Sequence, residues 1–367
     1  MKMKRSKRIN VKRYDRKMAT EKPADTGLDW HSPNAAPFQV AGFAWFRQDG
    51  LYRRMPRRPA HALRQAVDEL ANCTAGGQIR FQTDSPRIVL RVRSAPAQMD
   101  HMAVTGQCGF DCYVGAPGAQ RYVSTTRLTP GCGDYEQALL NLPERAMRHI
   151  TLNFPLYTGV SEVKVGLAQG ARVLPPVPFA RKRPIVVYGT SITQGGCAAR
   201  PGMLYTNILS RKMNMEFINL GFSGSGRGEP EVARIIAEIP RPACLVLDYE
   251  ANAGYDGLRA TFSEFIRIIR AAHPAAPIVV VSRIRFSGEL LNPAVRRERV
   301  RCRDFQCAAV ADLRRQGDTR ISFFDGRRLL AGDWDECTVD GVHPTDHGFA
   351  QIAAALLPVL RRAIRHC

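Results

Sequence analysis

The sequence predicts a two-domain protein in which a β-sandwich or jelly-roll domain is followed by an α/β domain built on a parallel sheet. Three observations predict this fold class. The chain has 367 residues, more than one hydrophobic core usually organises, and 45% of them are hydrophobic, enough for two cores. Apolar and polar residues alternate within residues 38–167, as they do in strands. After residue 184, short apolar runs alternate instead with helix-like stretches.

The N-terminal residues 1–23 are predicted to form a basic disordered tail. They hold ten Lys or Arg against Asp15 and Glu21, and they show no hydrophobic period. The whole chain carries a net charge of +20, and the charge outside the tail comes mainly from arginines dispersed along expected helices, as in 296–301. Dispersed charge is typical of solvated faces, and no aromatic residues are interleaved with it. Nucleic acid is therefore not expected as a partner, and a role of the tail in nucleic-acid binding is a lesser alternative.

The first folded domain is expected over residues 24–170. Apolar and polar residues alternate in 88–93 and again in 160–167, which predicts strands with one buried face. Segments rich in Gly and Pro, such as 115–118, separate the short runs and predict turns. This spacing is typical of a β-sandwich or jelly roll. One helix, near residues 60–70, is expected to interrupt the strands.

A linker over residues 171–184 is expected next, because it carries four prolines and three closely spaced cations. The second domain then runs over 185–367. In one of its helical stretches Leu258, Phe262 and Phe265 recur at three and four residues, which predicts a single apolar helix face. Strands alternating with helices predict a parallel sheet, whose ligands gather at the carboxyl ends of the strands. The expected strands are 185–188, 217–220, 244–247, 278–281 and 321–324.

The spacing of the cysteines and the hydropathy of the chain bear on disulfides, metal sites and membrane segments. The ten cysteines are irregularly spaced and include no C-x-x-C pair. Disulfide frameworks belong to small secreted domains and zinc sites need paired spacing, so we expect reduced thiols and no metal. The chain has neither a run of about 18 apolar residues nor an apolar signal-peptide core at its charged start. These features predict a cytoplasmic protein without membrane attachment, and nothing in the sequence calls for a cofactor.

Four short blocks carry the residue types of an acyl-transfer enzyme. The first contains Ser191, the second Gly224, the third Asn252, and the last both Asp340 and His343; the first three follow expected strands. A serine hydroxyl is a weak nucleophile that needs an adjacent base, which His343 can supply, while Asp340 can hold the other ring nitrogen. The backbone N–H groups of Ser191 and Gly224 and the side-chain amide of Asn252 would form the oxyanion hole.

In this order the blocks resemble the SGNH branch of the GDSL hydrolases, whose Ser, Gly, Asn and His fall on Ser191, Gly224, Asn252 and His343. The first block reads G-T-S-I instead of G-D-S-L, and the third reads Y-E-A-N instead of G-x-N-D. Both departures resemble a subfamily of two-domain bacterial proteins with an N-terminal β-domain marked by G-x-D-L-Y. The resemblance implies a flavodoxin-like, three-layer α/β/α catalytic domain.

The G-x-D-L-Y motif matches residues 109–113, with cysteine in place of leucine. Asp111 and Tyr113 in this motif are either turn and core residues or, in the sharper hypothesis, part of a substrate pocket that the β-domain helps to shape. Arg200 and Glu229 lie close in sequence to the first two blocks and are further candidates for substrate binding. Surface ion pairs are the alternative role for both.

Other interpretations of the same residues were weighed. Ser191 alone could cap a helix, and His343 with His347 invites a metal pair. The zinc-peptidase pattern requires glutamate directly after the first histidine, where proline stands. The glycines of 221–228 do not complete a dinucleotide-binding G-x-G-x-x-G motif, because Glu229 occupies the last position.

The sequence thus predicts an SGNH-type serine esterase that removes a small acyl group through an acyl-enzyme intermediate, and acetyl on carbohydrate is the leading hypothesis. The carbohydrate part follows from the resemblance and the accessory β-domain, not from the residues themselves. A non-catalytic carbohydrate-binding protein with the same fold is the main alternative. The sequence does not indicate the oligomeric state.

Overall fold

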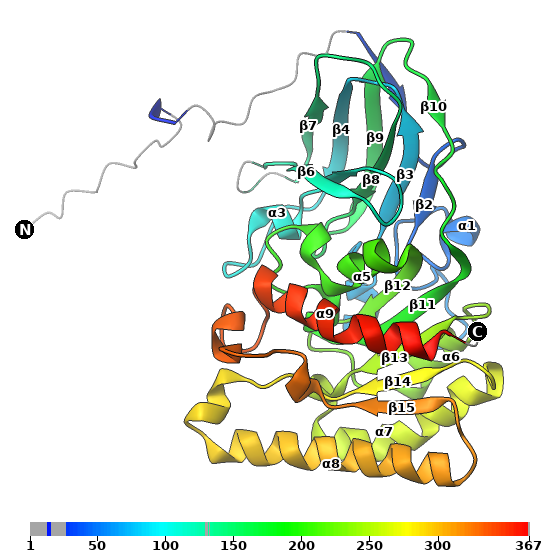
Figure 1. The fold of residues 1–367 in the computed structure, drawn as a ribbon, viewed down its shortest axis with the longest axis vertical. Helices are drawn as coiled ribbons and strands as arrows, with labels where there is room; N and C mark the ends of the chain where they lie inside the picture. The colour runs from blue at the N-terminus through cyan, green and yellow to red at the C-terminus, as the bar shows by residue number, and fades with distance from the viewer. Residues whose placement is uncertain (1–12, 16–26, 129–130, 132, 366–367) are drawn as a thin grey trace, which may run out of the picture.

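The structure, a computed structural model, describes residues 13–15, 27–128, 131 and 133–365. Two parts are stacked along its longest axis: a β-rich N-terminal part and a C-terminal part in which helices surround a sheet (Figure 1). The expected basic tail, residues 1–23, lies outside the described residues apart from 13–15.

The N-terminal part is a sandwich of two antiparallel sheets. Side chains from both sheets meet in one core, where Phe81, Leu90 and Val165 are fully buried. The prediction of a β-sandwich domain is confirmed. The first sheet has the order β1 (Leu28–His31), β9 (Val160–Ala168), β4 (Arg87–Ser94), β7 (Tyr135–Asn141). The second has the order β10 (Val173–Leu174), β3 (Gln78–Thr83), β8 (Arg148–Asn153), β5 (Asp111–Val114), β6 (Arg121–Thr125), and β2 (Gln39–Ala41) pairs with β3.

Short helices lie between these strands: α1 (Phe46–Asp49), α2 (Gln65–Leu70) and α3 (Val104–Gln107). The helix expected near 60–70 begins only at Gln65, because the preceding Arg64 has an extended backbone. Part of the expected linker, 171–184, is also in strands. Its residues Val173 and Leu174 form β10, and the first strand of the second domain begins already at Arg181.

The C-terminal part contains a five-stranded, fully parallel sheet. All five expected strands are present, and two of them start earlier than the apolar runs suggested. This arrangement confirms the expected α/β fold class. In spatial order the strands are β12 (Met215–Gly221), β11 (Arg181–Gly189), β13 (Cys244–Asp248), β14 (Ile278–Val281) and β15 (Ile321–Phe324).

Helices cover both faces of this sheet. Successive side chains of a strand point to opposite faces, so each strand contributes to two cores. Tyr188 of β11 contributes to one core and its neighbour Val187 to the other. One face is covered by α6 (Pro230–Ala237), α7 (Glu250–Ala272) and α8 (Pro293–Arg315), and the other by α5 (Tyr205–Met213) and α9 (Asp346–Ala363) (Figure 1).

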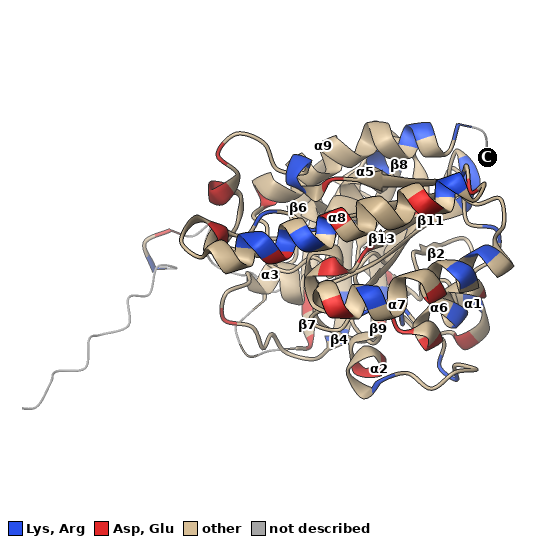
Figure 2. Cartoon of the chain, turned by 90° about the horizontal axis from the view of Figure 1, so that it is seen from below, with Lys and Arg blue, Asp and Glu red and all other residues tan. Residues whose placement is uncertain are grey.

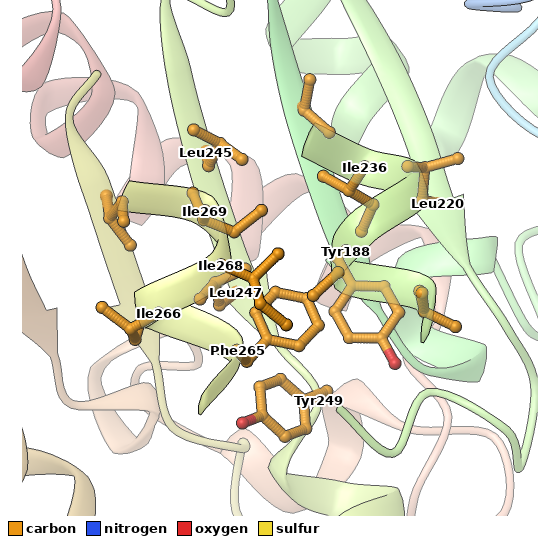
Figure 3. Close-up of a cluster of buried hydrophobic side chains, with 14 of the residues drawn as sticks. Tyr188, Leu220, Ile236, Leu245, Leu247, Tyr249, Phe265, Ile266, Ile268 and Ile269 are labelled. Atoms are coloured by element: carbon orange, nitrogen blue, oxygen red, sulfur yellow. The ribbon is translucent and has the colours of Figure 1, made fainter. Parts of the chain in front are cut away.

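The core under α6 and α7 is rich in aromatic rings (Figure 3). The ring of Phe265, from α7, stacks on Tyr188 with centroids 5.2 Å apart and on Tyr249 with centroids 5.7 Å apart. Burying a large apolar side chain stabilises the fold by about 1.5–3 kcal/mol, so this cluster fixes α7 against the strand that leads to Ser191.

Several helices carry Lys or Arg, and α8 carries many of them, interspersed with acidic residues (Figure 2). On α8, Arg296 and Arg301 are exposed, as expected for a solvated face. Arg299 differs: it is buried, and its Nε lies 2.8 Å from Oε2 of Glu289. The carboxylate of Glu289 stabilises the buried charge of Arg299. The sequence pattern alone did not indicate this ion pair.

Within the described ranges, no helix combines the length and apolar character needed to cross a bilayer. In the described part of the chain, the cysteines at positions 73, 108, 112, 197, 302, 307 and 337 are free thiols.

Candidate active site

Ser191 lies directly after β11, at the start of the one-turn helix α4 (Ser191–Gln194). The residue in the capping position is Thr190, and its side chain makes no capping hydrogen bond. Ser191 is therefore the first helical residue, not a cap. Its hydroxyl faces His343, with Oγ 2.9 Å from Nε2 of the ring.

The loop before α9 orients this histidine. Oδ1 of Asp340 accepts hydrogen bonds from the backbone N–H of Val342 at 3.0 Å and of His343 at 2.7 Å. Oδ2 of the same carboxylate lies 2.7 Å from Nδ1 of His343. Ser191, His343 and Asp340 thus form a continuous chain of hydrogen bonds, the arrangement in which imidazole accepts a proton from a hydroxyl.

The carboxylate of Asp340 is kept ionised. Partial burial by itself raises its pKa, but the hydrogen bonds from the backbone of His343 and Val342 and the contact with the His343 ring outweigh burial, so the pKa of Asp340 lies below its ordinary value. A charged carboxylate can stabilise the imidazolium that forms when His343 takes the serine proton.

The expected oxyanion-hole residues come from the next strand ends. Gly189, at the end of β11, is in register with Gly221 of β12 and Asp248 of β13, so the first three blocks meet at one edge of the sheet. Gly224, in the loop after β12, has φ +64°, and a Cβ there would point into open space. Glycine at this position serves the backbone conformation and keeps the site open to substrate.

Asn252 lies in the first turn of α7, before a break in the helix at Gly254. Its Oδ1 accepts a hydrogen bond from the N–H of Gly226 at 3.3 Å. Because the two amide atoms point to opposite sides, this bond leaves the NH₂ group to donate elsewhere. Gly226 in turn packs on Gly189, since a Cβ at 226 would collide with the carbonyl oxygen of Gly189.

Buried polar residues hold the nucleophile turn in place. Thr193 Oγ1 donates to Oδ2 of Asp248 at 3.2 Å and lies 2.9 Å from the hydroxyl of Tyr205. Burial raises the pKa of Asp248 to about 8, with the Thr193 hydrogen bond opposing the shift. Asn219, near the end of β12, donates from Nδ2 to the carbonyl of Thr193 at 2.6 Å. This network positions α4 and does not touch the reacting atoms.

Hydrogen bonds across the boundary between the two domains involve three of the proposed substrate-binding residues. Asp111 has no exposed surface, and its carboxylate accepts hydrogen bonds from Nη1 of Arg200 at 2.9 Å and from the N–H of Gly202 at 2.7 Å. Nη1 of Arg200 also donates to the hydroxyl of Tyr113 at 2.7 Å. The polar atoms of these residues therefore satisfy one another across the domain boundary, and the role of Asp111, Tyr113 and Arg200 in substrate binding stays a prediction.

Glu229 is engaged in a similar way. Its Oε1 accepts from Nε of Arg64 at 3.0 Å, and its Oε2 accepts from the hydroxyl of Tyr188 at 3.2 Å. Oε1 thus links the β-domain to the start of α6, and Oε2 links the start of α6 to β11. The role of Glu229 in substrate binding stays a prediction.

The structure adds residues from the β-domain that sequence reasoning missed. His101, between β4 and α3, places Nε2 3.8 Å from Oδ2 of Asp340. The hydroxyl of Tyr157 donates to the carbonyl of Ser191 at 3.3 Å. No sequence signal could have paired these residues with blocks that lie far along the chain.

Donor groups of the kind that bind metals also meet here. His101, Cys197, Asp340 and His343 each offer one ligand atom, all within 4.8 Å of one another. Burial, followed by the nearby charge of Asp340, raises the pKa of the Cys197 thiol to about 11, so the group is protonated at neutral pH. His347 is not in this cluster: it is exposed and its Nε2 lies 2.7 Å from Nε2 of Gln351.

Comparison with known families identifies the chain. Residues 182–361 match the GDSL-like lipase/acylhydrolase family, and residues 28–173 match the N-terminal domain of SGNH-hydrolase-type esterases. The protein belongs to the SGNH/GDSL hydrolases. Within this superfamily it has the two-domain organisation that the sequence blocks predicted, and it is a carboxylic ester hydrolase.

Solved structures support the fold of this hydrolase along most of its length. A GDSL-like lipase from Bacteroides ovatus is 27% identical, covering 92% of this chain and 98% of its own, with a TM-score of 0.84. The salicylyl-acyltransferase SsfX3 from a tetracycline biosynthetic pathway is 22% identical, with coverage of 90% and 96% and a TM-score of 0.73. A family two carbohydrate esterase from Cellvibrio japonicus is 14% identical, with coverage of 92% and 98% and a TM-score of 0.57. No curated protein matches the chain at a significant level.

Proposed function

We propose that this SGNH hydrolase removes small acyl groups, acetyl above all, from hydroxyls of a carbohydrate, through an acyl-enzyme intermediate on Ser191. The observation that carries the proposal is the hydrogen-bonded chain from Ser191 Oγ through His343 to Asp340, with distances of 2.9 and 2.7 Å. A non-catalytic binding protein would have no need of this arrangement.

The reaction follows from the geometry in two steps. In the first, Oγ of Ser191 attacks the ester carbonyl while Nε2 of His343 takes its proton, and the oxyanion is held by N–H donors at Ser191 and Gly224 and by the amide of Asn252. His343 then returns the proton to the departing alcohol. In the second, water attacks the acyl-serine, again with His343 as the base, and releases the acid.

The low exposure of Ser191 supports a substrate with a small acyl group. Ser191 is only 8% exposed. Tyr157, from the β-domain, donates to its backbone carbonyl, and a Cβ at Gly196 would lie 2.9 Å from Cδ2 of His343 and 3.0 Å from the Tyr157 hydroxyl. These close contacts leave little space for a long acyl chain on this side of the serine.

The carbohydrate part of the proposal has support from architecture. Two esterases share this fold over both domains: the carbohydrate esterase from Cellvibrio japonicus already described and an acetyl xylan esterase from Butyrivibrio proteoclasticus, with a TM-score of 0.56 over 91% of this chain. At 13–14% identity the likeness extends to the fold, so the choice of alcohol rests on experiment.

A substrate panel tests the proposal. The purified full chain is assayed on p-nitrophenyl esters of rising acyl length, on acetylated monosaccharides and on acetylated xylan, with Ser191→Ala as the matched control. We expect kcat/KM to be highest for acetyl and to fall with chain length, and acetate to be released from at least one acetylated sugar. A preference for long acyl chains, or acetyl esters cleaved only on non-sugar alcohols, would refute the substrate class while leaving ester hydrolysis intact.

A further inference from the structure

The β-domain places a second histidine beside the carboxylate that serves His343. Nε2 of His101 lies 3.8 Å from Oδ2 of Asp340, and the ring centroids of His101 and His343 are 5.9 Å apart. On its other side, Nδ1 of His101 lies 3.3 Å from Oδ1 of Asp100. A neutral imidazole can bind a metal through either ring nitrogen, and Nε2 is the nitrogen of His101 that lies beside the triad.

A thiol completes the group. Cys197 is buried, and its Sγ lies 3.7 Å from the carbonyl oxygen of His101, which keeps it next to the same loop. One ligand atom from each of His101, Cys197, Asp340 and His343 falls within 4.8 Å of the other three. Residues from both domains, in three distant stretches of the sequence, therefore converge on one point.

The donor set has the chemistry of a transition-metal site. Two imidazole nitrogens, one sulfur and one carboxylate oxygen are the ligand types of tetrahedral zinc, with metal distances of about 2.0–2.3 Å. Such geometry separates the donors by roughly 3.3–3.8 Å, so these side chains need only modest rotations to enclose the ion. The ligands, as one thiolate, one carboxylate and two neutral rings, would balance the two positive charges of Zn²⁺.

We propose that Zn²⁺ binds to His101, Cys197, Asp340 and Nδ1 of His343 and reversibly inhibits the hydrolase. Binding releases the thiol proton of Cys197 to solvent. The proton on Nδ1 of His343 moves to Nε2, so the ring stays neutral and Nε2 becomes the protonated nitrogen. A protonated Nε2 cannot accept the hydrogen of Ser191, and Asp340 no longer orients the ring. Occupancy of the site and catalysis therefore exclude each other.

The proposed inhibition rests on the proposed ester hydrolysis, whereas the proposed metal binding does not depend on it. Two measurements on the full chain, after metal ions are removed with EDTA, test metal binding and inhibition separately. Titration with Co²⁺, a spectroscopic substitute for Zn²⁺, should give the charge-transfer absorption of a cobalt–thiolate bond. Titration with Zn²⁺ should lower p-nitrophenyl acetate hydrolysis, with EDTA restoring the rate. Mg²⁺, which prefers oxygen ligands, should do neither.

Variants outside the triad locate the site. His101→Ala and Cys197→Ser should each raise the zinc concentration for half-inhibition by roughly tenfold or more, relative to their own uninhibited rates, and Cys197→Ser should abolish the thiolate absorption. Cys307→Ser, at an exposed cysteine on α8, is the matched control and should change neither readout.

Several outcomes would overturn the inference: no saturable cobalt–thiolate absorption, the same zinc response in wild type and both site variants, or occupancy without loss of activity in an active enzyme. If the protein proved inactive on esters, an absorption that both site variants remove would still establish the metal site, and the proposed function alone would fail.

Discussion

The reactivity of Ser191 depends on its hydrogen bond to His343, 2.9 Å from Oγ to Nε2. Ser191→Ala should lower kcat by roughly 10⁴-fold or more, because the attacking atom is gone while binding is retained. His343→Ala should cost about as much, and the double variant should be little worse, because the two groups act as one unit. Steady-state kinetics on p-nitrophenyl acetate measure the loss, and circular dichroism checks folding. A Ser191→Ala enzyme with a tenth of wild-type activity would rule the assignment out.

Asp340 holds the ring of His343 and carries the negative charge that stabilises its protonated form. Asp340→Asn should reduce kcat by up to about 10⁴-fold, the scale seen when a triad carboxylate is lost. Since the pKa of Asp340 lies below its ordinary value, the wild-type carboxylate is ionised at neutral pH, where steady-state kinetics on p-nitrophenyl acetate measure the loss. An Asp340→Asn enzyme with wild-type kcat would contradict the role of Asp340.

Asn252 is held by its bond from Gly226 and is assigned to the oxyanion hole. Removing one such donor costs about 10²- to 10³-fold in kcat, so Asn252→Ala should lose activity in that range with a modest change in KM. Comparing the change in kcat with the change in KM distinguishes an oxyanion-hole donor from a residue that only binds substrate. A change confined to KM would make Asn252 a residue that binds substrate in the ground state.

At the scale of elements, the carboxyl ends of β11 and β13 are joined through a buried carboxyl group. Asp248, at the end of β13, has a pKa of about 8, raised by burial, and it accepts from Thr193 of α4. The folded state then keeps a proton that the unfolded chain loses near pH 4. The free energy of unfolding should consequently fall as pH rises from about 4 to 8, by at most about 1.4 kcal/mol per pH unit from this group.

Asp248→Asn removes this titration while preserving the shape of the side chain. Urea unfolding of both proteins at pH 5, 6, 7 and 8 should show that the variant gains stability relative to wild type as pH rises. The gain should level off above about pH 8, where the wild-type group is ionised in both states. An equal difference at all four pH values would show that Asp248 does not titrate in this window.

At the scale of the whole molecule, buried polar contacts join the two domains at two places. At one, Asp111 accepts hydrogen bonds from Arg200 and from the N–H of Gly202. At the other, the fully buried Arg54 donates to the carbonyl oxygens of Cys73, Leu70 and Gly221, so a β-domain side chain holds the end of β12. The loop that carries Gly224 therefore depends on the β-domain for its position.

Asp111→Ala should destabilise the protein by about 3–5 kcal/mol, because it leaves the largely buried Arg200 without its carboxylate. Urea unfolding measures the change, and Asp256→Ala, at an exposed aspartate on α7, is the control that should stay within about 0.5 kcal/mol of wild type. A loss of less than about 1 kcal/mol would mean that the domains are held together mainly by other contacts.

Several features follow from the sequence alone because they depend on local patterning. The five buried strands of the parallel sheet were predictable from short apolar runs, and the apolar face of α7 from spacings of three and four residues. Asp340 and His343 are three residues apart, so their contact is set by one loop. Parallel topology then brings Ser191 and Gly224 to the same edge, since all strands end there.

Only the tertiary structure decided what the β-domain contributes. The sequence offered Asp111 as a candidate for substrate binding, and only the folded chain shows that both its oxygens accept hydrogen bonds from Asn153, Arg200 and Gly202. His101 carried no signal, because its neighbour Asp340 lies more than two hundred residues away in sequence. A side chain's role is readable from sequence when its partners are local or when strand order dictates them. It is set by packing between domains when the partners are remote, because burial and hydrogen-bond satisfaction exist only in the folded molecule.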